Sequence, residues 1–167
     1  MIILALGSNL GDRLAYLQAA INKIREKNIL SNVECAKIYE SPAMLKADSP
    51  LEWDINFLNT VIIGKSDLSA MELLIEIKKI EQELGRKARG RWSPREIDID
   101  IIAYGSEIHN EENLTLPHAD FDIRDFVLKP LCDVAANWIC PLRNKTAIQM
   151  LLELEQSQLQ PTSLSVA

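Results

Sequence analysis

The 167-residue chain contains only two histidines and three cysteines, and aromatic residues make up 5% of it. Cys35, Cys132 and Cys140 are odd in number and far apart in the sequence. This argues against a disulfide framework and against a Cys-x-x-Cys metal site. We therefore expect buried thiols in a reducing compartment and a cytoplasmic location.

The chain also lacks long apolar segments and an excess of positive charge. No stretch approaches the roughly 20 consecutive apolar residues of a membrane span. The apolar start, residues 1–6, is too short for a signal peptide and lacks its basic region, so it predicts a strand. A net charge of −6 argues against a domain that coats nucleic acid, because such domains are usually basic. We expect neither a membrane nor a nucleic acid as a partner.

Hydrophobic residues make up 47% of the chain, which is enough for one domain with a full core. Ser69 and Glu72 fit a capping box at the start of a helix. Hydrophobic spacing predicts strands at 2–6, 33–40, 57–64 and 97–104 and helices at about 12–27 and 69–84. Two further helices are predicted, one over 124–131 that ends at Pro130 and one over 146–155.

The order β-α-β-β-α-β over the first 104 residues is typical of an α+β fold. It predicts a ferredoxin-like split-βαβ antiparallel sheet with the helices packed on one face. The segment 41–55 contains two prolines and is expected to be a long functional loop. We place the domain at residues 1–156 and interpret the polar segment 157–167 as a tail or the start of a linker.

Two aspartates stand at the end of the decapeptide 91–100, Arg-Trp-Ser-Pro-Arg-Glu-Ile-Asp-Ile-Asp. Asp98 and Asp100 alternate with isoleucines at 97, 99 and 101, as in a strand with one buried face. Both carboxylates then point the same way, about 6.5–7 Å apart. At this spacing they can share two hard cations that phosphate oxygens bridge. The alternative is an ordinary amphipathic edge strand whose acids face water.

A local basic segment precedes this strand, with Arg86, Lys87, Arg89, Arg91 and Arg95 within ten positions. In an acidic chain it favours a small anionic ligand such as a polyphosphate, although a charge run is more often a solvated surface. Trp92 in the same segment indicates a ring that stacks on a ligand. Because like charges repel, we expect the loop 85–94 to be mobile until a ligand supplies opposite charge.

The segment 7–13, Gly-Ser-Asn-Leu-Gly-Asp-Arg, follows a predicted strand and precedes a predicted helix. It lacks the spacing of a P-loop and of a dinucleotide-binding fingerprint. We interpret it as a tight turn with an Asn or Asp cap. Protein-kinase motifs are absent as well, so a phosphoryl-transfer enzyme with this sequence must use another scaffold.

Five motifs occur together in this order: Gly-Ser-Asn-Leu-Gly-Asp-Arg at 7–13, Tyr-Glu-Ser-Pro at 39–42, Phe-Leu-Asn at 57–59, the decapeptide at 91–100, and Leu-Pro-His at 116–118 with Arg124 and Phe126. Together they resemble the 6-hydroxymethyl-7,8-dihydropterin pyrophosphokinase family of folate biosynthesis. The resemblance implies a Mg²⁺-dependent enzyme that transfers pyrophosphate from ATP to the hydroxymethyl group of a reduced pterin and releases AMP. It also implies a ferredoxin-like fold, and it suggests an adjacent folate-pathway enzyme as a partner.

The resemblance implies a role for each matching residue. Asp98 and Asp100 would bind two Mg²⁺ ions, and they would be catalytic together with Arg86, Arg91 and Arg95. The residues implied for the pterin substrate are Ser41, Pro42, Phe57, Asn59, Trp92 and Phe126. The residues implied for ATP are Lys78, Glu81, Arg91, Trp92, Arg95, Ile101, Thr115, His118 and Arg124. Without the resemblance, Phe57 and Phe126 fit core positions equally well, and His118 fits a loop histidine.

The chain departs from the family pattern at three positions. Ala43 stands where a second proline is usual, and Lys78 where a glutamine near the adenine is common. Ala119 stands where a tyrosine often follows the histidine. These departures concern single positions, most of them on the ATP side, and leave Asp98 and Asp100 unaffected.

Two other classes of function fit parts of the sequence. A small RNA-binding module would share the split-βαβ order, but the acidic charge and the lack of an aromatic-rich strand disfavour it. A metal-dependent phosphoesterase would use Asp98 and Asp100 for hydrolysis and would need no pterin.

Overall fold

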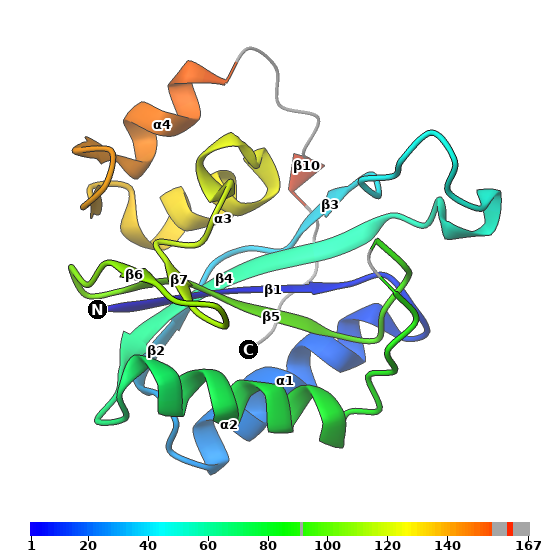
Figure 1. Ribbon diagram of the computed structural model, residues 1–167, viewed down its shortest axis with the longest axis horizontal. Helices are drawn as coiled ribbons and strands as arrows, with labels where there is room; N and C mark the ends of the chain where they lie inside the picture. Colours follow the sequence, from blue (N-terminus) through cyan, green and yellow to red (C-terminus); the bar gives the residue numbers. More distant parts are fainter. Residues whose placement is uncertain (91, 155–159, 162–167) are drawn as a thin grey trace.

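An antiparallel sheet forms the centre of the computed structural model, which describes residues 1–90, 92–154 and 160–161 (Figure 1). Its strands lie in the order β10–β3–β4–β1–β5, and β2 also pairs with β4. They are β1 (Ile2–Ser8), β2 (Ser31–Cys35), β3 (Tyr39–Ser41), β4 (Phe57–Lys65), β5 (Asp98–Tyr104) and β10 (Gln160–Pro161). Two small hairpins lie outside this sheet, β6 (His109–Asn110) with β7 (Thr115–Leu116) and β8 (Ile139–Cys140) with β9 (Lys145–Thr146).

Two long helices cover one face of the sheet (Figure 1). α1 (Arg13–Glu26) begins after Asp12, whose carboxylate accepts a hydrogen bond from the Ala15 amide at 3.1 Å. α2 (Ala70–Glu83) begins with the capping box of Ser69 and Glu72. Both predicted helices and their caps are confirmed. Their apolar sides pack against β1, β4 and β5 to form the larger core.

The two helices of the β-α-β-β-α-β segment lie on one face, as expected, but the later helices do not. α3 (Asp125–Ala135) and α4 (Ala147–Glu153) pack on the opposite face and bury a second core (Figure 1). The central strands require this cover, because Ile3 and Val61 point to that side and are fully buried. The expectation covered only the first 104 residues, and both of these helices begin after that segment. Two 3-10 turns, η1 (Leu51–Trp53) and η2 (Phe121–Ile123), lie in loops.

Two predicted boundaries differ from the structure. α3 continues through Pro130 instead of ending there. The proline ring removes one backbone hydrogen bond from the helix. The free energy gained by burying Leu128 and Leu131 on either side offsets that cost. The predicted strand 33–40 is divided into β2 and β3. Between them, the Lys37 amide leaves the sheet and donates to the Asp133 carboxylate of α3 at 3.2 Å.

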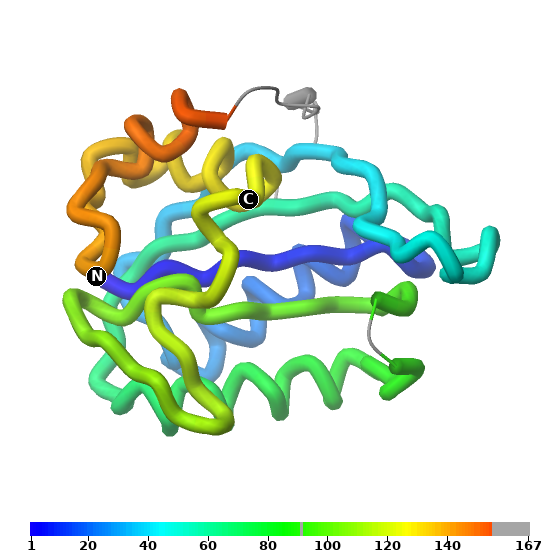
Figure 2. The backbone as a smooth tube through the Cα atoms, turned by 45° about the horizontal axis from the view of Figure 1, so that its top comes forward, coloured from blue at the N-terminus to red at the C-terminus, as the bar shows by residue number. Residues whose placement is uncertain are grey.

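The strand register aligns three chemically important positions across the sheet. Gly7 of β1 lies opposite Asn59 of β4 on one side and opposite Asp98 of β5 on the other. Figure 2 shows β1 running between these two strands. A Cβ atom at Gly7 would lie 3.2 Å from Asn59 Oδ1 and 3.5 Å from the Phe57 ring. Glycine therefore leaves room for both side chains over the sheet.

At the outer edge of the sheet, Gln160 pairs with Glu40 and Pro161 with Tyr39. The rest of the predicted tail lies outside the described residues, so the domain boundary at residue 156 stays a prediction. Within the part of the chain that is described, no helix is both long and apolar enough to cross a membrane.

The loop between α2 and β5 is held by a buried carboxylate. Arg89 makes a two-pronged ion pair with Glu96, with N–O distances of 2.6 and 2.9 Å. Glu96 also accepts a hydrogen bond from the Lys87 amide at 3.4 Å and is only 7% exposed. The Glu96 side chain near the end of the loop therefore contacts two residues near its start, Lys87 and Arg89.

The charges of this loop do not simply repel one another, as the sequence-based argument assumed. Arg86 and Arg95 both pair with Asp98, and Arg89 pairs with Glu96. Arg91 lies outside the described residues. Three of the five cations therefore have an acid partner in the protein itself, and the mobility of the loop stays a prediction.

Glu96→Gln is expected to loosen the loop. Hydrogen bonds from Arg89 lower the pKa of Glu96 from 4.5 to about 2. Because the folded-state pKa lies below the unfolded one, this stabilisation is present above pH ~4.5 and is lost as the pH falls towards 2. Loss of the charge should lower the free energy of unfolding by about 1–3 kcal/mol and speed hydrogen exchange at residues 86–90.

The matched control is Glu76→Gln, which removes the partner of Lys79 from an exposed ion pair on α2. It should change stability by less than about 0.5 kcal/mol and leave exchange in the loop unchanged. Equal exchange at residues 86–90 in both variants would show that Glu96 does not hold the loop.

Candidate active site

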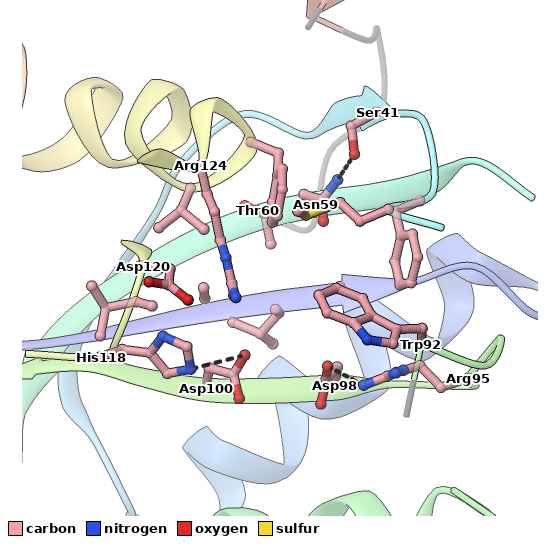
Figure 3. A pocket seen from close by; sticks show the side chains of 18 of the residues that line it. Ser41, Asn59, Thr60, Trp92, Arg95, Asp98, Asp100, His118, Asp120 and Arg124 are labelled. Atoms are coloured by element: carbon pink, nitrogen blue, oxygen red, sulfur yellow. Dashed lines mark hydrogen bonds and ion pairs between the residues drawn. The ribbon is translucent and has the colours of Figure 1, made fainter. Parts of the chain in front are cut away.

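A cavity of about 420 Å³ opens on the face of the sheet that carries α3, where the helix leaves the strands uncovered (Figure 3). Its walls come from β1, β3, β4, β5, α2, the loops after β3 and before β5, the segment after β7 and the start of α3. The sequence-predicted residues that line it are Ser41, Pro42, Phe57, Asn59, Lys78, Arg86, Trp92, Arg95, Asp98, Asp100, His118, Arg124 and Phe126.

β5 places both predicted acids in this cavity. Ile99 and Ile101 point to the opposite face and are buried against the larger core. The predicted alternation is therefore confirmed. Asp98 and Asp100 line a pocket, which disfavours the alternative of an ordinary edge strand whose acids only face water. Arg86 and Arg95 pair with the two oxygens of Asp98 at 2.6 and 2.7 Å.

The negative charge of Asp100 is compensated less directly than that of Asp98. Burial and the charge of Asp98 raise the pKa of Asp100, and His118, Lys78 and Arg124 oppose the shift. His118 Nε2 lies 3.9 Å from Asp100 Oδ2 (Figure 3). The two acids thus repel each other in a partly enclosed site, which favours an added cation.

Glu81 contacts both the strand that carries the two acids and one of the arginines that pair with them. It is 3% exposed, and its Oε1 accepts a hydrogen bond from the Ile99 amide of β5 at 2.7 Å. Lys78 and Arg86 pair with the same carboxylate at 3.0 and 2.5 Å. Burial raises the pKa of Glu81, and the charges of Lys78 and Arg86 oppose that shift. Glu81 therefore fixes the strand and one arginine at once.

A second cavity of about 460 Å³ lies beside the first, between the end of α2 and the basic loop. Glu81 lines it, and Lys78, Arg86 and Arg95 line both cavities. The two cavities therefore share a cationic boundary, which suits a ligand that carries several negative charges.

The β4 side of the main cavity is less charged. Asn59 Nδ2 donates to Ser41 Oγ at 2.9 Å, which fixes the amide orientation between β4 and β3 (Figure 3). Phe57 and Phe126 line the same cavity and are half-buried. Phe126 also packs against the second core, so the alternative of a core role stays open for that ring.

Three predicted ATP residues are not brought to the main cavity. Glu81 lines the neighbouring cavity, Ile101 is buried in the core on the other face, and Thr115 is exposed on β7. Arg91 lies outside the described residues. Their roles stay predictions.

The sequence-based assignment gave no role to Asn9, which bonds to Arg95, or to Glu96. In the sequence, only the Gly-Ser-Asn motif pointed to Asn9. The side chain of Asn9 contacts residues that lie 86 and 46 positions further along the chain. In the described part of the chain, no cluster of three or more His, Cys, Asp and Glu side chains could hold a metal ion. A cation at Asp98 and Asp100 would therefore need ligand or water oxygens as well.

A profile of the 7,8-dihydro-6-hydroxymethylpterin-pyrophosphokinase (HPPK) family matches residues 3–136. The chain is 42% identical over 144 residues to the 2-amino-4-hydroxy-6-hydroxymethyldihydropteridine pyrophosphokinase of Aquifex aeolicus, covering 86% of each protein. It is 41% identical over 143 residues to the folate synthesis bifunctional protein of Chlamydia caviae, covering 85% of this chain but 31% of that protein.

Solved structures show the same fold at low identity. The wild-type HPPK-DHPS of Plasmodium falciparum with SDX-DHP superposes with a TM-score of 0.63 and 16% identity, covering 91% of this chain and 43% of that one. A second wild-type structure of that protein gives a TM-score of 0.65 at 15% identity, covering 91% and 44%. The profile match and the 42% identity together show that the chain belongs to the 7,8-dihydro-6-hydroxymethylpterin-pyrophosphokinase family.

Proposed function

We propose that the chain transfers pyrophosphate from ATP to 6-hydroxymethyl-7,8-dihydropterin, giving the pterin diphosphate and AMP. The family match supports this activity. One observation carries the assignment of the site: a single cavity joins acids and arginines from β5 and its preceding loop to aromatic rings and a fixed amide from β3, β4 and α3. The charged groups suit a triphosphate with its cations, and the rings and the amide suit a flat heterocycle.

The pterin is assigned to the β4 side of the cavity. Its flat ring would stack between Phe57 and Phe126, because both half-buried rings line the cavity. Asn59, held by Ser41 and beside Pro42, would bind the hydrogen-bonding edge of the pterin. This places the hydroxymethyl group towards β5 and its acids.

ATP is assigned to the cationic side. Lys78, His118 and Arg124 line the main cavity with Arg86 and Arg95, and this supports their assignment to the nucleotide. Glu81, in the neighbouring cavity, supports them through Lys78 and Arg86. The roles of Arg91, Ile101 and Thr115 rest on the family resemblance alone.

Asp98 and Asp100 fit two Mg²⁺ ions. Their oxygens are the hard donors that Mg²⁺ prefers. Burial and, after it, the charge of Asp98 raise the pKa of Asp100, and a bound cation would oppose both effects. Bound Mg²⁺ would neutralise charge on the triphosphate as the leaving group forms. Water and phosphate oxygens would complete each ion's coordination.

The protein groups act mainly by position and charge. The hydroxymethyl oxygen attacks the β-phosphorus, and the bond from that phosphorus to the α,β-bridging oxygen breaks, which releases AMP. Arg86 and Arg95 would exchange part of their contact with Asp98 for phosphate oxygens, since guanidinium groups pair with both carboxylates and phosphates. Trp92 lines the cavity and would help to exclude water, which competes as a nucleophile.

Three finer features belong to the same proposal. The strand order β5–β1–β4–β3, with α1 and α2 as crossovers on one face, supports a ferredoxin-like core to which α3 and α4 are added. Free thiols at Cys35, Cys132 and Cys140 support a cytoplasmic location. Bifunctional folate synthesis relatives support an adjacent folate-pathway enzyme as a partner.

Incubation with ATP, Mg²⁺ and the reduced pterin should produce AMP and pterin diphosphate in equal amounts. Attack at the β-phosphorus moves two phosphates together, so ADP should not accumulate. Nucleotide chromatography checks this outcome, and omission of the pterin is the control. ADP as the main product would rule out the proposed reaction, and nucleotide breakdown without pterin would indicate a phosphoesterase.

Asp98→Ala and Asp100→Ala should each lower turnover by about 10²- to 10³-fold, the usual cost of losing one preorganised electrostatic group. Thermal stability should change little in Asp100→Ala, because the mutation removes a carboxylate that repels its neighbour. Asp67→Ala, at an exposed position before α2, is the control and should keep full turnover. Near-normal turnover of both site variants at modest Mg²⁺ would show that the acids bind no essential cation.

Phe57→Ala and Phe126→Ala should weaken pterin binding by about 0.5–1.5 kcal/mol or more, the contribution of an aromatic pair beyond its buried area. Affinity for a non-hydrolysable ATP analogue should be nearly unchanged, since stacking acts on one ligand only. Calorimetric titration with each ligand measures both. Parallel losses for both ligands that follow a lower melting temperature would assign the rings to the core.

A further inference from the structure

Asn9 follows the end of β1 and connects two loops that are far apart in the sequence. Its side chain is buried, with 2% exposed. Its Oδ1 accepts a hydrogen bond from the Arg95 amide at 2.8 Å, and its Nδ2 donates to the Ile55 carbonyl at 3.1 Å. Its own amide donates to the Arg95 carbonyl at 3.2 Å. One amide side chain therefore joins the loop before β5 to the loop before β4.

The two loops lead to different sides of the pocket. The Arg95 guanidinium lines the cavity and pairs with Asp98 at 2.7 Å. Ile55 stands two residues before Phe57, which begins β4 and lines the same cavity. Asn9 itself does not line the cavity, so it acts on residues that would touch the ligands and not on the ligands.

The loop before β4 depends strongly on this contact. The amides of Ser49, Trp53 and Ile55 bond to carbonyls of the same loop and so do not hold it to the sheet. Arg13 donates to the Asn56 carbonyl at 2.8 Å, but its side chain is 31% exposed. The bond from Asn9 is more protected from water, and a buried polar group is costly to leave unpaired.

We infer that Asn9 is a positioning residue for pyrophosphate transfer, because it sets the distance between the Arg95 side and the Phe57 side of the pocket. This inference rests on the proposed function, which places one substrate on each side. A misplacement of about 1 Å can slow a reaction about 100-fold. Binding of either substrate alone depends mainly on one side, so it needs Asn9 less than the transfer step does.

Two variants separate the contacts of this side chain. Asn9→Ala removes both side-chain bonds and keeps the backbone bond to Arg95. Asn9→Asp keeps the acceptor for the Arg95 amide but turns an oxygen towards the Ile55 carbonyl. Hydrogen exchange should rise at residues 52–56 and 93–96 in Asn9→Ala, and at 52–56 alone in Asn9→Asp.

The kinetic result should be a loss in turnover with binding retained. We expect kcat to fall about 10- to 100-fold in Asn9→Ala, while the dissociation constants of the pterin alone and of a non-hydrolysable ATP analogue alone change less than about threefold. Thr146→Ala, which removes the cap of α4 away from the pocket, lowers stability and should keep kcat within about twofold.

Two results would overturn the inference. One is a wild-type kcat in Asn9→Ala; the other is a joint fall of kcat and both affinities that matches the melting-temperature loss of Thr146→Ala. If Asn9→Ala does not fold, the same quantities, kcat, both affinities and the melting temperature, are compared between Asn9→Asp and Thr146→Ala. If the wild-type protein makes no AMP, the proposed function fails, and unchanged exchange at both segments would then refute the loop connection independently.

Discussion

The Asp98 carboxylate lies between the guanidinium groups of Arg86 and Arg95, and the pocket depends on this charge cluster. Each partly buried charge would cost several kcal/mol if it stood alone. Glu81, which is 3% exposed, pairs with Arg86 on its other side and accepts the Ile99 amide of β5. Asp98 and Glu81 each pair with two cations, and Arg86 joins the two acids, so the acids, the arginines and the strand are positioned together.

The cluster also connects the free protein to its proposed chemistry. In the protein alone, the arginines satisfy Asp98. In the proposed reaction, phosphates would give the same arginines a second anionic partner and leave the acids available to cations. Asp100 is compensated less closely, by His118 at 3.9 Å. The proposal therefore implies an exchange of ion pairs when a charged nucleotide binds.

The parts of this architecture that follow local rules could be predicted from the sequence. The alternation around Asp98, the capping box at Ser69 and the Asp12 cap depend on neighbours within a few residues. The continuation of α3 through Pro130 could not be predicted, because burial outweighs the local cost of proline. The bridge made by Asn9 was also missed, because its partners are 46 and 86 residues away and bond through backbone atoms that carry no sequence signal.

We propose that Asp98 and Asp100 make the affinity of the pocket for a nucleotide depend on a divalent cation. Calorimetric titration of a non-hydrolysable ATP analogue, with Mg²⁺ and with a chelator, measures this dependence. We expect binding at least about tenfold tighter with Mg²⁺ in the wild type, since the bare triphosphate is repelled by Asp98 and Asp100. The difference should shrink in the double variant with Asn at both positions. Equal affinity of the wild type with and without Mg²⁺ would show that the two carboxylates bind no cation that the nucleotide needs.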